Sequence, residues 1–190
     1  MKHSLLGAFL VSICAADIKI FTPEQIHIAI GSSPSEMNLQ WSTIHGGDIK
    51  TASSVEWGED PNHMSNSVDG DSTIFVDGGE ESYTQTHHLA TMTGLSPSTK
   101  YYYQVGGPDS GFSDVLEFTS APDTGSDLKA PLRFGIWGDM GTANSQILSS
   151  VQKEVASGNF DMILHVGDFA YNMDNDNGRN GDAFMNNIQR

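Results

Sequence analysis

Cysteine and basic side chains are scarce in this sequence. Its 190 residues include a single cysteine, and 9 lysines and arginines stand against 24 aspartates and glutamates, for a formal net charge of −15. Such an acidic chain repels polyanions, which excludes a nucleic-acid binder and a binder of anionic membranes. A phosphate-bearing ligand would need local positive charge from a metal or a few placed arginines. Hydrophobic residues make up 37% of the chain, enough for a buried core, so wholesale disorder is not expected.

A run long enough to span a bilayer is also missing from the amino end. Residues 1–16 instead have the three parts of a secretory signal: a charge at Lys2, an apolar run over Leu5–Ile13, and the small-residue sequence Cys14-Ala15-Ala16. We predict that residues 1–16 are a signal peptide, whose removal takes away the only cysteine. The mature chain is then secreted or lies in a lumen such as that of the lysosome, with no disulfide and no membrane attachment.

Residues 23–119 follow a period of two, punctuated by Gly, Pro, Asn and Asp. Apolar and polar residues alternate around Ile26–Ile30, Met37–Trp41, Val55–Trp57 and Ile74–Val76, and again over residues 84–92, 100–105 and 115–119. About seven short strands in roughly 100 residues predict an antiparallel β-sandwich, which we assign to residues 17–121. The neighbours His87 and His88 must point to opposite faces of one strand, so they are not expected to chelate a metal.

One segment of this half is more specific. Residues 95–105 (Leu-Ser-Pro-Ser-Thr-Lys-Tyr-Tyr-Tyr-Gln-Val) resemble the corner between the fifth and sixth strands of fibronectin type III domains, where a tyrosine bonds back to the backbone. Tyr101 occupies that place. Three successive tyrosines could also form a platform for sugars or bases, but Tyr101 and Tyr103 share one strand face, which favours a core role.

The pattern changes after a predicted linker at residues 122–130. Residues 132–137 and 162–166 are nearly continuous apolar runs, typical of strands covered on both faces. Between them, residues 144–156 have a helical period, with Thr142 or Asn144 as the cap and Gly158 just past the end. We predict a right-handed β-α-β unit with parallel strands in residues 131–190.

Two further features of this second half are expected. A helix should begin near Asp182, because Phe184, Met185 and Ile188 follow at helical spacing. His165 is expected to be a packed, hydrogen-bonded strand histidine rather than a residue that supports a metal ligand.

Two acidic residues directly follow the two apolar strands, at the sheet edge where open α/β sheets bind their ligands. Asp139 and Asp168 each follow one of the two apolar strands, and parallel strands end at the same edge of a sheet, so the carboxylates can converge. Three interpretations remain open from the spacing. The carboxylates could bind a metal together with Tyr171, they could form an acid–base pair of the kind found in glycosidases, or they could cap backbone groups in turns. A tyrosine ligand would point to ferric iron, because only a strongly acidic ion removes a phenol proton at neutral pH.

The residues around these carboxylates resemble a known family. Gly138–Gly141 (Gly-Asp-Met-Gly) and Gly167–Tyr171 (Gly-Asp-Phe-Ala-Tyr) are similar to the first two of the five metal-binding blocks of purple acid phosphatases, which are calcineurin-like metallophosphoesterases. The preceding sandwich resembles the N-terminal domain of that family. The fold class expected is therefore a two-part α+β chain: a fibronectin-like sandwich, then the first β-α-β unit of an incomplete α/β metallophosphoesterase domain.

The resemblance also implies a site. Asp139 and Tyr171 would bind Fe(III), and Asp168 would bridge to a second metal, which is iron, zinc or manganese. The implied reaction is the hydrolysis of phosphate monoesters at acid pH by a metal-bound hydroxide.

The family's remaining blocks have no counterpart before Arg190, and they supply an asparagine and three histidine ligands as well as a substrate histidine. We therefore expect this chain to be an inactive, C-terminally truncated form, with metal ligands but no further catalytic residue. Two other functions stay open: another metallophosphoesterase, such as a phosphodiesterase or nucleotidase, and a secreted β-sandwich binding module with a vestigial catalytic half.

Overall fold

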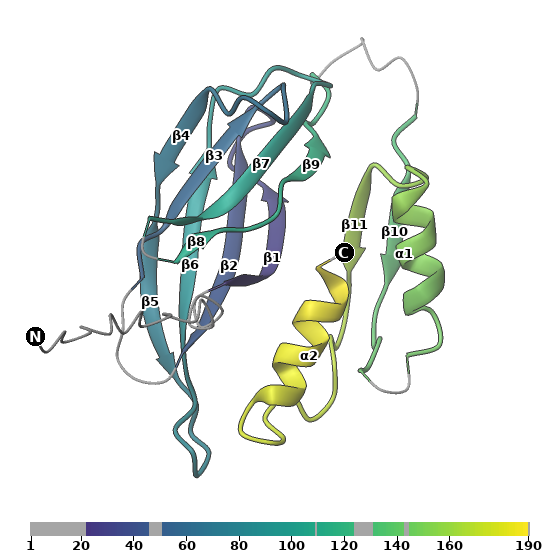
Figure 1. Ribbon diagram of the computed structural model, residues 1–190. Helices are drawn as coiled ribbons and strands as arrows, with labels where there is room; N and C mark the ends of the chain where they lie inside the picture. The colour runs from purple at the N-terminus through teal and green to yellow at the C-terminus, as the bar shows by residue number, and fades with distance from the viewer. Residues whose placement is uncertain (1–21, 46–50, 109, 124–130, 143–144, 190) are drawn as a thin grey trace, which may run out of the picture.

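The computed structural model describes residues 22–45, 51–108, 110–123, 131–142 and 145–189. The predicted signal peptide and most of the predicted linker lie outside these residues. The described residues form a β-sandwich, a parallel strand pair with one helix between its strands, and a final helix (Figure 1).

The sandwich is built from two antiparallel sheets. The first has the order β1-β2-β6-β5 and consists of β1 (Pro23–Ile30), β2 (Met37–His45), β5 (Asp71–Val76) and β6 (Thr84–Met92). The second has the order β4-β3-β7-β8, with β9 also paired to β7. It consists of β3 (Ser54–Gly58), β4 (Asn66–Asp69), β7 (Lys100–Gly107), β8 (Gly111–Phe112) and β9 (Leu116–Thr119). The predicted antiparallel sandwich is confirmed.

Two of these strands were not expected from the sequence. The polar strand β4 lies in the stretch between Glu59 and Ser72, and β8 has only two residues. Each pairs with one neighbour at the margin of the second sheet, so its residues are mostly exposed and carry no alternation of apolar and polar side chains.

The alternating residues of the two sheets meet in one core. Leu39, Val55, Met92 and Val105 are fully buried at its centre. Tyr101 and Tyr103 belong to the same core and contact Phe118. The Tyr101 hydroxyl accepts the backbone N–H of Ser96 at 3.0 Å, which confirms the predicted corner. Tyr101 and Tyr103 therefore serve the core, whereas Tyr102 lies on the other face of the strand, under the Lys100 side chain.

The histidine pair of β6 alternates as predicted. His88 is 2% exposed, stacks on Trp41 and lies within hydrogen-bond distance of the Thr43, Thr51 and Ser53 hydroxyls. His87 is exposed on the other face of the sheet.

The second half begins with the expected β-α-β unit. Strand β10 (Phe134–Trp137) pairs in parallel with β11 (Met162–His165), and α1 (Leu148–Ala156) lies between them in the chain. The helix begins four residues later than predicted, and its first backbone N–H bonds to the Ser145 hydroxyl (3.2 Å). The expected end is confirmed, since Gly158 has a φ of 65° just beyond the helix.

The strands are less covered than predicted. Ile136 in β10 is 61% exposed and Val166, directly after β11, is 55% exposed, so the two apolar runs are not covered on both faces within the described residues. The physical reason is that β10 and β11 form a two-stranded sheet, and no other strand of the described residues pairs with it.

The final helix, α2 (Arg179–Ile188), begins three residues earlier than predicted, after Gly178 in a left-handed conformation. It lies beside β1 of the sandwich and beside β11 (Figure 1). No helix among the described residues has the length and apolar character needed to cross a membrane.

Candidate metal site at the strand ends

Strands β10 and β11 bring their carboxyl ends to one edge. Trp137 is opposite His165 in the parallel register, and the Val166 N–H bonds to the Trp137 carbonyl at 2.7 Å. The strand ends are held so close that a Cβ at Gly138 would collide with the Val166 carbonyl oxygen. Only glycine lets the two backbones approach in this way.

Asp139 and Asp168 meet directly beyond this contact. The Asp168 backbone N–H donates to Oδ1 of Asp139 at 3.0 Å. Asp139 has a left-handed backbone, with φ at 53°, which turns its side chain back across the edge. Gly167, with φ at 92°, lies under the same carboxylate, since a Cβ placed there would be 3.1 Å from Oδ1.

Tyr171 joins the same cluster. Its ring is about half exposed, and its hydroxyl lies close enough to the Asp139 carboxylate to feel its charge. Desolvation, the Asp139 charge and hydrogen bond, and the Asp168 charge all raise the pKa of the Tyr171 phenol above its usual 10. The structure therefore places all three predicted site residues together.

The donor set of this cluster suits a hard cation. Two carboxylates and a phenol offer oxygen ligands, which ferric and other hard ions prefer. Within the described ranges, no group of three or more His, Cys, Asp and Glu side chains is arranged to hold a metal ion. Asp139, Asp168 and Tyr171 thus fit one part of a ligand shell, and the phenol lies outside the residue types of that search.

His165 supports the loop that carries Asp168. Its Nε2–H donates to the Asp168 backbone carbonyl at 2.9 Å, and its ring contacts the Phe169 ring with centroids 4.5 Å apart. The predicted hydrogen bond of this strand histidine is confirmed, but it goes to Asp168, so the expectation that His165 would not support a candidate ligand is wrong. The partner at the Asp168 backbone could not be predicted, because that contact depends on the turn at Gly167.

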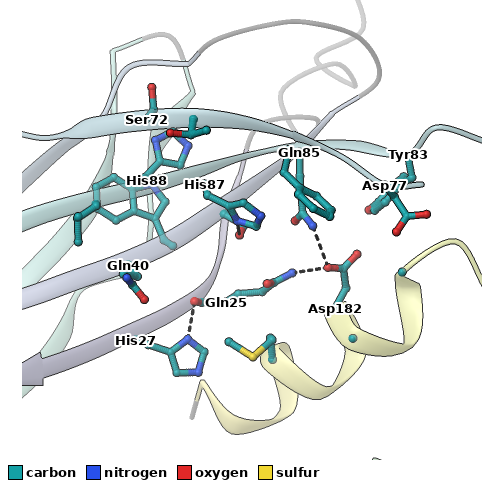
Figure 2. A pocket seen from close by; sticks show the side chains of 18 of the residues that line it. Gln25, His27, Gln40, Ser72, Asp77, Tyr83, Gln85, His87, His88 and Asp182 are labelled. Atoms are coloured by element: carbon teal, nitrogen blue, oxygen red, sulfur yellow. Dashed lines mark hydrogen bonds between the residues drawn. The ribbon is translucent and has the colours of Figure 1, made fainter. Parts of the chain in front are cut away.

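A separate cleft lies between the first sheet and α2 (Figure 2). It has a volume of about 620 Å³, and Gln25, His27, Gln85, His87 and Asp182 are among the residues that line it. None of the three strand-end residues does so. The cleft could not be predicted from the sequence, because Gln25 and Asp182 on its two walls are 157 residues apart in the chain.

Two histidines of the cleft, His27 and His87, have lowered pKa values. The Nδ1–H of His27 donates to the Gln25 carbonyl at 2.6 Å, since a carbonyl only accepts. Burial lowers the pKa of His27, and this hydrogen bond opposes the shift. His87 is exposed on its sheet face, but its partial desolvation in the cleft also lowers its pKa, and the negative charge of Asp182 opposes this shift.

The fold and the strand-end residues define a class of two-part proteins in which a β-sandwich precedes an α/β domain with an acidic site at its strand ends. A family model described as the purple acid phosphatase N-terminal domain matches residues 23–120, just over half of the chain. The chain belongs to the purple acid phosphatase family.

Individual relatives extend the similarity beyond the sandwich. Acid phosphatase type 7 of Danio rerio is 40% identical over 181 residues, which cover 93% of this chain and 39% of the relative. The Homo sapiens protein of the same name is 33% identical over 168 residues, covering 88% and 36%. Purple acid phosphatase 21 of Arabidopsis thaliana is 30% identical over 157 residues, covering 80% and 31%. The chain thus spans less than two fifths of the length of the curated relatives it matches.

A solved structure shows the same fold. Purple acid phosphatase PPD1 from yellow lupin (Lupinus luteus) seeds superposes with a TM-score of 0.65 at 22% sequence identity, over 89% of this chain and 33% of that one.

Proposed function

We propose that this chain forms the N-terminal part of an acid phosphatase that hydrolyses phosphate monoesters at a two-metal centre. The observation that carries the proposal is the meeting of Asp139, Asp168 and Tyr171 at one sheet edge, where Asp139 bonds to the Asp168 backbone and both carboxylates act on the Tyr171 phenol. The printed names of the relatives, acid phosphatase type 7 and purple acid phosphatase, support the same activity.

The charge of the chain supports a metal-dependent reaction. At a formal charge of −15, the protein repels a phosphate ester unless cations stand at the site. Asp139 and Tyr171 would hold Fe(III). Asp168 would be shared between Fe(III) and a second metal, which is a divalent ion of iron, zinc or manganese. When bound, the two ions would acidify water and neutralise the charge of the phosphoryl oxygens.

The chain's own residues prepare these ligands. Asp139 uses Oδ1 to fix the Asp168 backbone, and the glycines at 138 and 167 keep the strand ends in contact. Desolvation and the nearby carboxylates raise the pKa of Tyr171, so the residue is a neutral phenol in the metal-free chain. A ligand of this kind releases its proton on metal binding, which makes metal affinity depend on pH.

The compartment belongs to the same proposal. The predicted signal peptide would deliver the protein to the cell exterior or to the lysosomal lumen. Phosphatase activity at acid pH suits either place.

The test uses the complete protein that carries this chain, assayed with p-nitrophenyl phosphate at pH 5. We expect hydrolysis, bound iron, and a visible absorption band from a phenolate on ferric iron. Tyr171→Phe should remove the band, and Asp168→Asn should remove activity together with one metal equivalent.

Asp174→Asn is the matched control, because Asp174 lies in the loop beyond the strand ends and outside the three-residue cluster. It should keep both band and activity. A complete protein that binds no metal and hydrolyses no phosphate ester would overturn the proposal and favour the β-sandwich binding module.

A further inference from the structure

Strand β1 carries a bulge on the side that faces α2. Glu24 is paired with Ser42 and His27 with Gln40, so Gln25 and Ile26 together stand opposite Trp41. Gln25 has a φ of 57°, a left-handed conformation that glutamine rarely adopts. A strained residue of this kind persists only where surrounding contacts hold it.

Helix α2 supplies those contacts. Asn186 Oδ1 accepts the Gln25 N–H at 3.1 Å, and Gln189 Oε1 accepts the Ile26 N–H at 3.0 Å. The Gln25 side-chain amide in turn donates to Asp182 Oδ1 at 2.8 Å (Figure 2). The bulge therefore turns two backbone N–H groups of β1 toward polar side chains of α2. These hydrogen bonds attach the helix to the sandwich at the point where β1 departs from regular pairing with β2.

The tip of the β5–β6 hairpin holds the start of the same helix. Arg179 forms an ion pair with Glu81 at 2.6 Å and lies over the Tyr83 ring, 4.9 Å from its centroid. The Glu81 N–H also donates to Asn177 Oδ1 at 3.2 Å. Both ends of α2 are thus fixed to the sandwich.

The opposite side of α2 holds the strand-end loop. The Asn180 side-chain amide donates to two successive backbone carbonyls, Tyr171 at 3.1 Å and Asn172 at 2.8 Å. The Gly181 N–H donates to the Met173 carbonyl at 3.0 Å. Phe184, which is 1% exposed, packs on the Phe169 ring in the same loop.

We propose that the N-terminal sandwich positions Tyr171 through α2, and that Asn180 is the positioning residue that joins the helix to the tyrosine backbone. The inference rests on the proposed function, since it assigns Tyr171 a ligand role. It gives the sandwich a task in the active site although none of the three proposed ligands lies in the sandwich. Hydrogen bonds run from Gln25 to Asp182 in the helix, and from Asn180 in the same helix to the Tyr171 carbonyl.

The test reads the position of Tyr171 without any metal. 3-Fluorotyrosine is placed at residue 171 of the metal-free 190-residue chain, and its ¹⁹F resonance is recorded. The parent chain should give one sharp line, shifted from that of free 3-fluorotyrosine. Asn180→Asp is nearly isosteric but cannot donate to the two carbonyls, so the line should move toward the free value and broaden.

The sandwich end is tested with the double variant Asn186→Ala/Gln189→Ala, which touches neither Tyr171 nor its loop. It should move the ¹⁹F line in the same direction as Asn180→Asp. Gln25→Gly is a milder second variant, because glycine accepts the left-handed backbone and loses only the side-chain bond to Asp182. The matched control is Asn187→Ala, in the same helix, where the backbone carbonyl contacts Gln152; its line should stay in place.

An unchanged line in Asn180→Asp overturns the role of Asn180. A line that moves in Asn180→Asp but not in the double variant or in Gln25→Gly overturns the role of the sandwich. Retained dispersion of the sandwich amide signals separates displacement of Tyr171 from unfolding. Because the readout needs no metal, a moved line in a protein without phosphatase activity would reject the proposed function alone.

Discussion

Oδ1 of Asp139 accepts the backbone N–H of Asp168 at 3.0 Å, across 29 residues of sequence and between the ends of two parallel strands. One acidic residue therefore holds the backbone of the other. We can therefore test the acceptor role of Asp139 separately from its negative charge.

Asp139→Ala should expose the Asp168 amide, whereas Asp139→Asn should keep it bonded, because asparagine retains an oxygen acceptor and tolerates the left-handed backbone. A bond worth about 1 kcal/mol corresponds to hydrogen exchange roughly fivefold faster at Asp168 in the alanine variant. Amide exchange measured by NMR checks this. Equal exchange in the alanine variant and the parent chain would contradict the bond.

Among the polar side chains of the sandwich, we expect the buried His88 to contribute most to the free energy of unfolding. His88→Leu leaves the hydroxyls around it without a ring nitrogen partner, and we expect the free energy of unfolding to fall by about 2 kcal/mol or more. Urea unfolding of the 190-residue chain measures it. His63→Leu, at an exposed loop position, is the control and should change stability by less than about 0.5 kcal/mol. Similar losses in both variants would argue against a special role for the buried ring.

The corner tyrosine offers a second stability test. Tyr101→Phe keeps the ring in the core but removes the acceptor for the Ser96 N–H, which should cost about 1 kcal/mol. Tyr102→Phe changes the next residue, whose ring faces Lys100 at the surface, and should cost clearly less. Thermal unfolding of the two variants, compared at the same pH, decides between them. The prediction is wrong if Tyr102→Phe costs as much.

The cleft histidine predicts how stability depends on pH. Burial lowers the pKa of His27, so the folded chain keeps this ring neutral where the unfolded chain, with a pKa near 6.5, already binds a proton. Because the unfolded state then holds more protons, the contribution of His27 to stability is complete above about pH 7 and declines as the pH falls through 6.5. His27→Asn should therefore lose less stability than the parent chain between pH 7 and pH 5. Urea unfolding at the two pH values checks the difference, and an equal or greater loss in the variant would refute it.

Much of the fold could be predicted because it rests on periodic burial. The alternation around Leu39 and Tyr101 predicts strands whose inward residues form the core, and the apolar runs before Asp139 and Asp168 predict the parallel pair. The strand-end cluster could be predicted for the same reason, since parallel strands end together. The roles of Asp139, Asp168 and Tyr171 as metal ligands stay a prediction.

The contacts of α2 could not be predicted in this way. Gln25 meets Asp182 across 157 residues through polar side chains that have no periodic pattern. The bulge that exposes Gln25 is a local departure from the strand period, and the helix start at Arg179 depends on the left-handed backbone of Gly178. Such features follow from tertiary contact rather than from local preference.

The bulge of β1 has one more consequence, for the behaviour of the protein at high concentration. A strand at the margin of a sheet is a template on which a second molecule can add its own strand and start aggregation. The backbone N–H groups of Gln25 and Ile26, which an added strand would need as donors, are already bonded to α2. The left-handed backbone of Gln25 also interrupts the extended edge with which such a strand would pair. The helix that holds the tyrosine loop thus also shields this side of the sandwich from intermolecular strand addition.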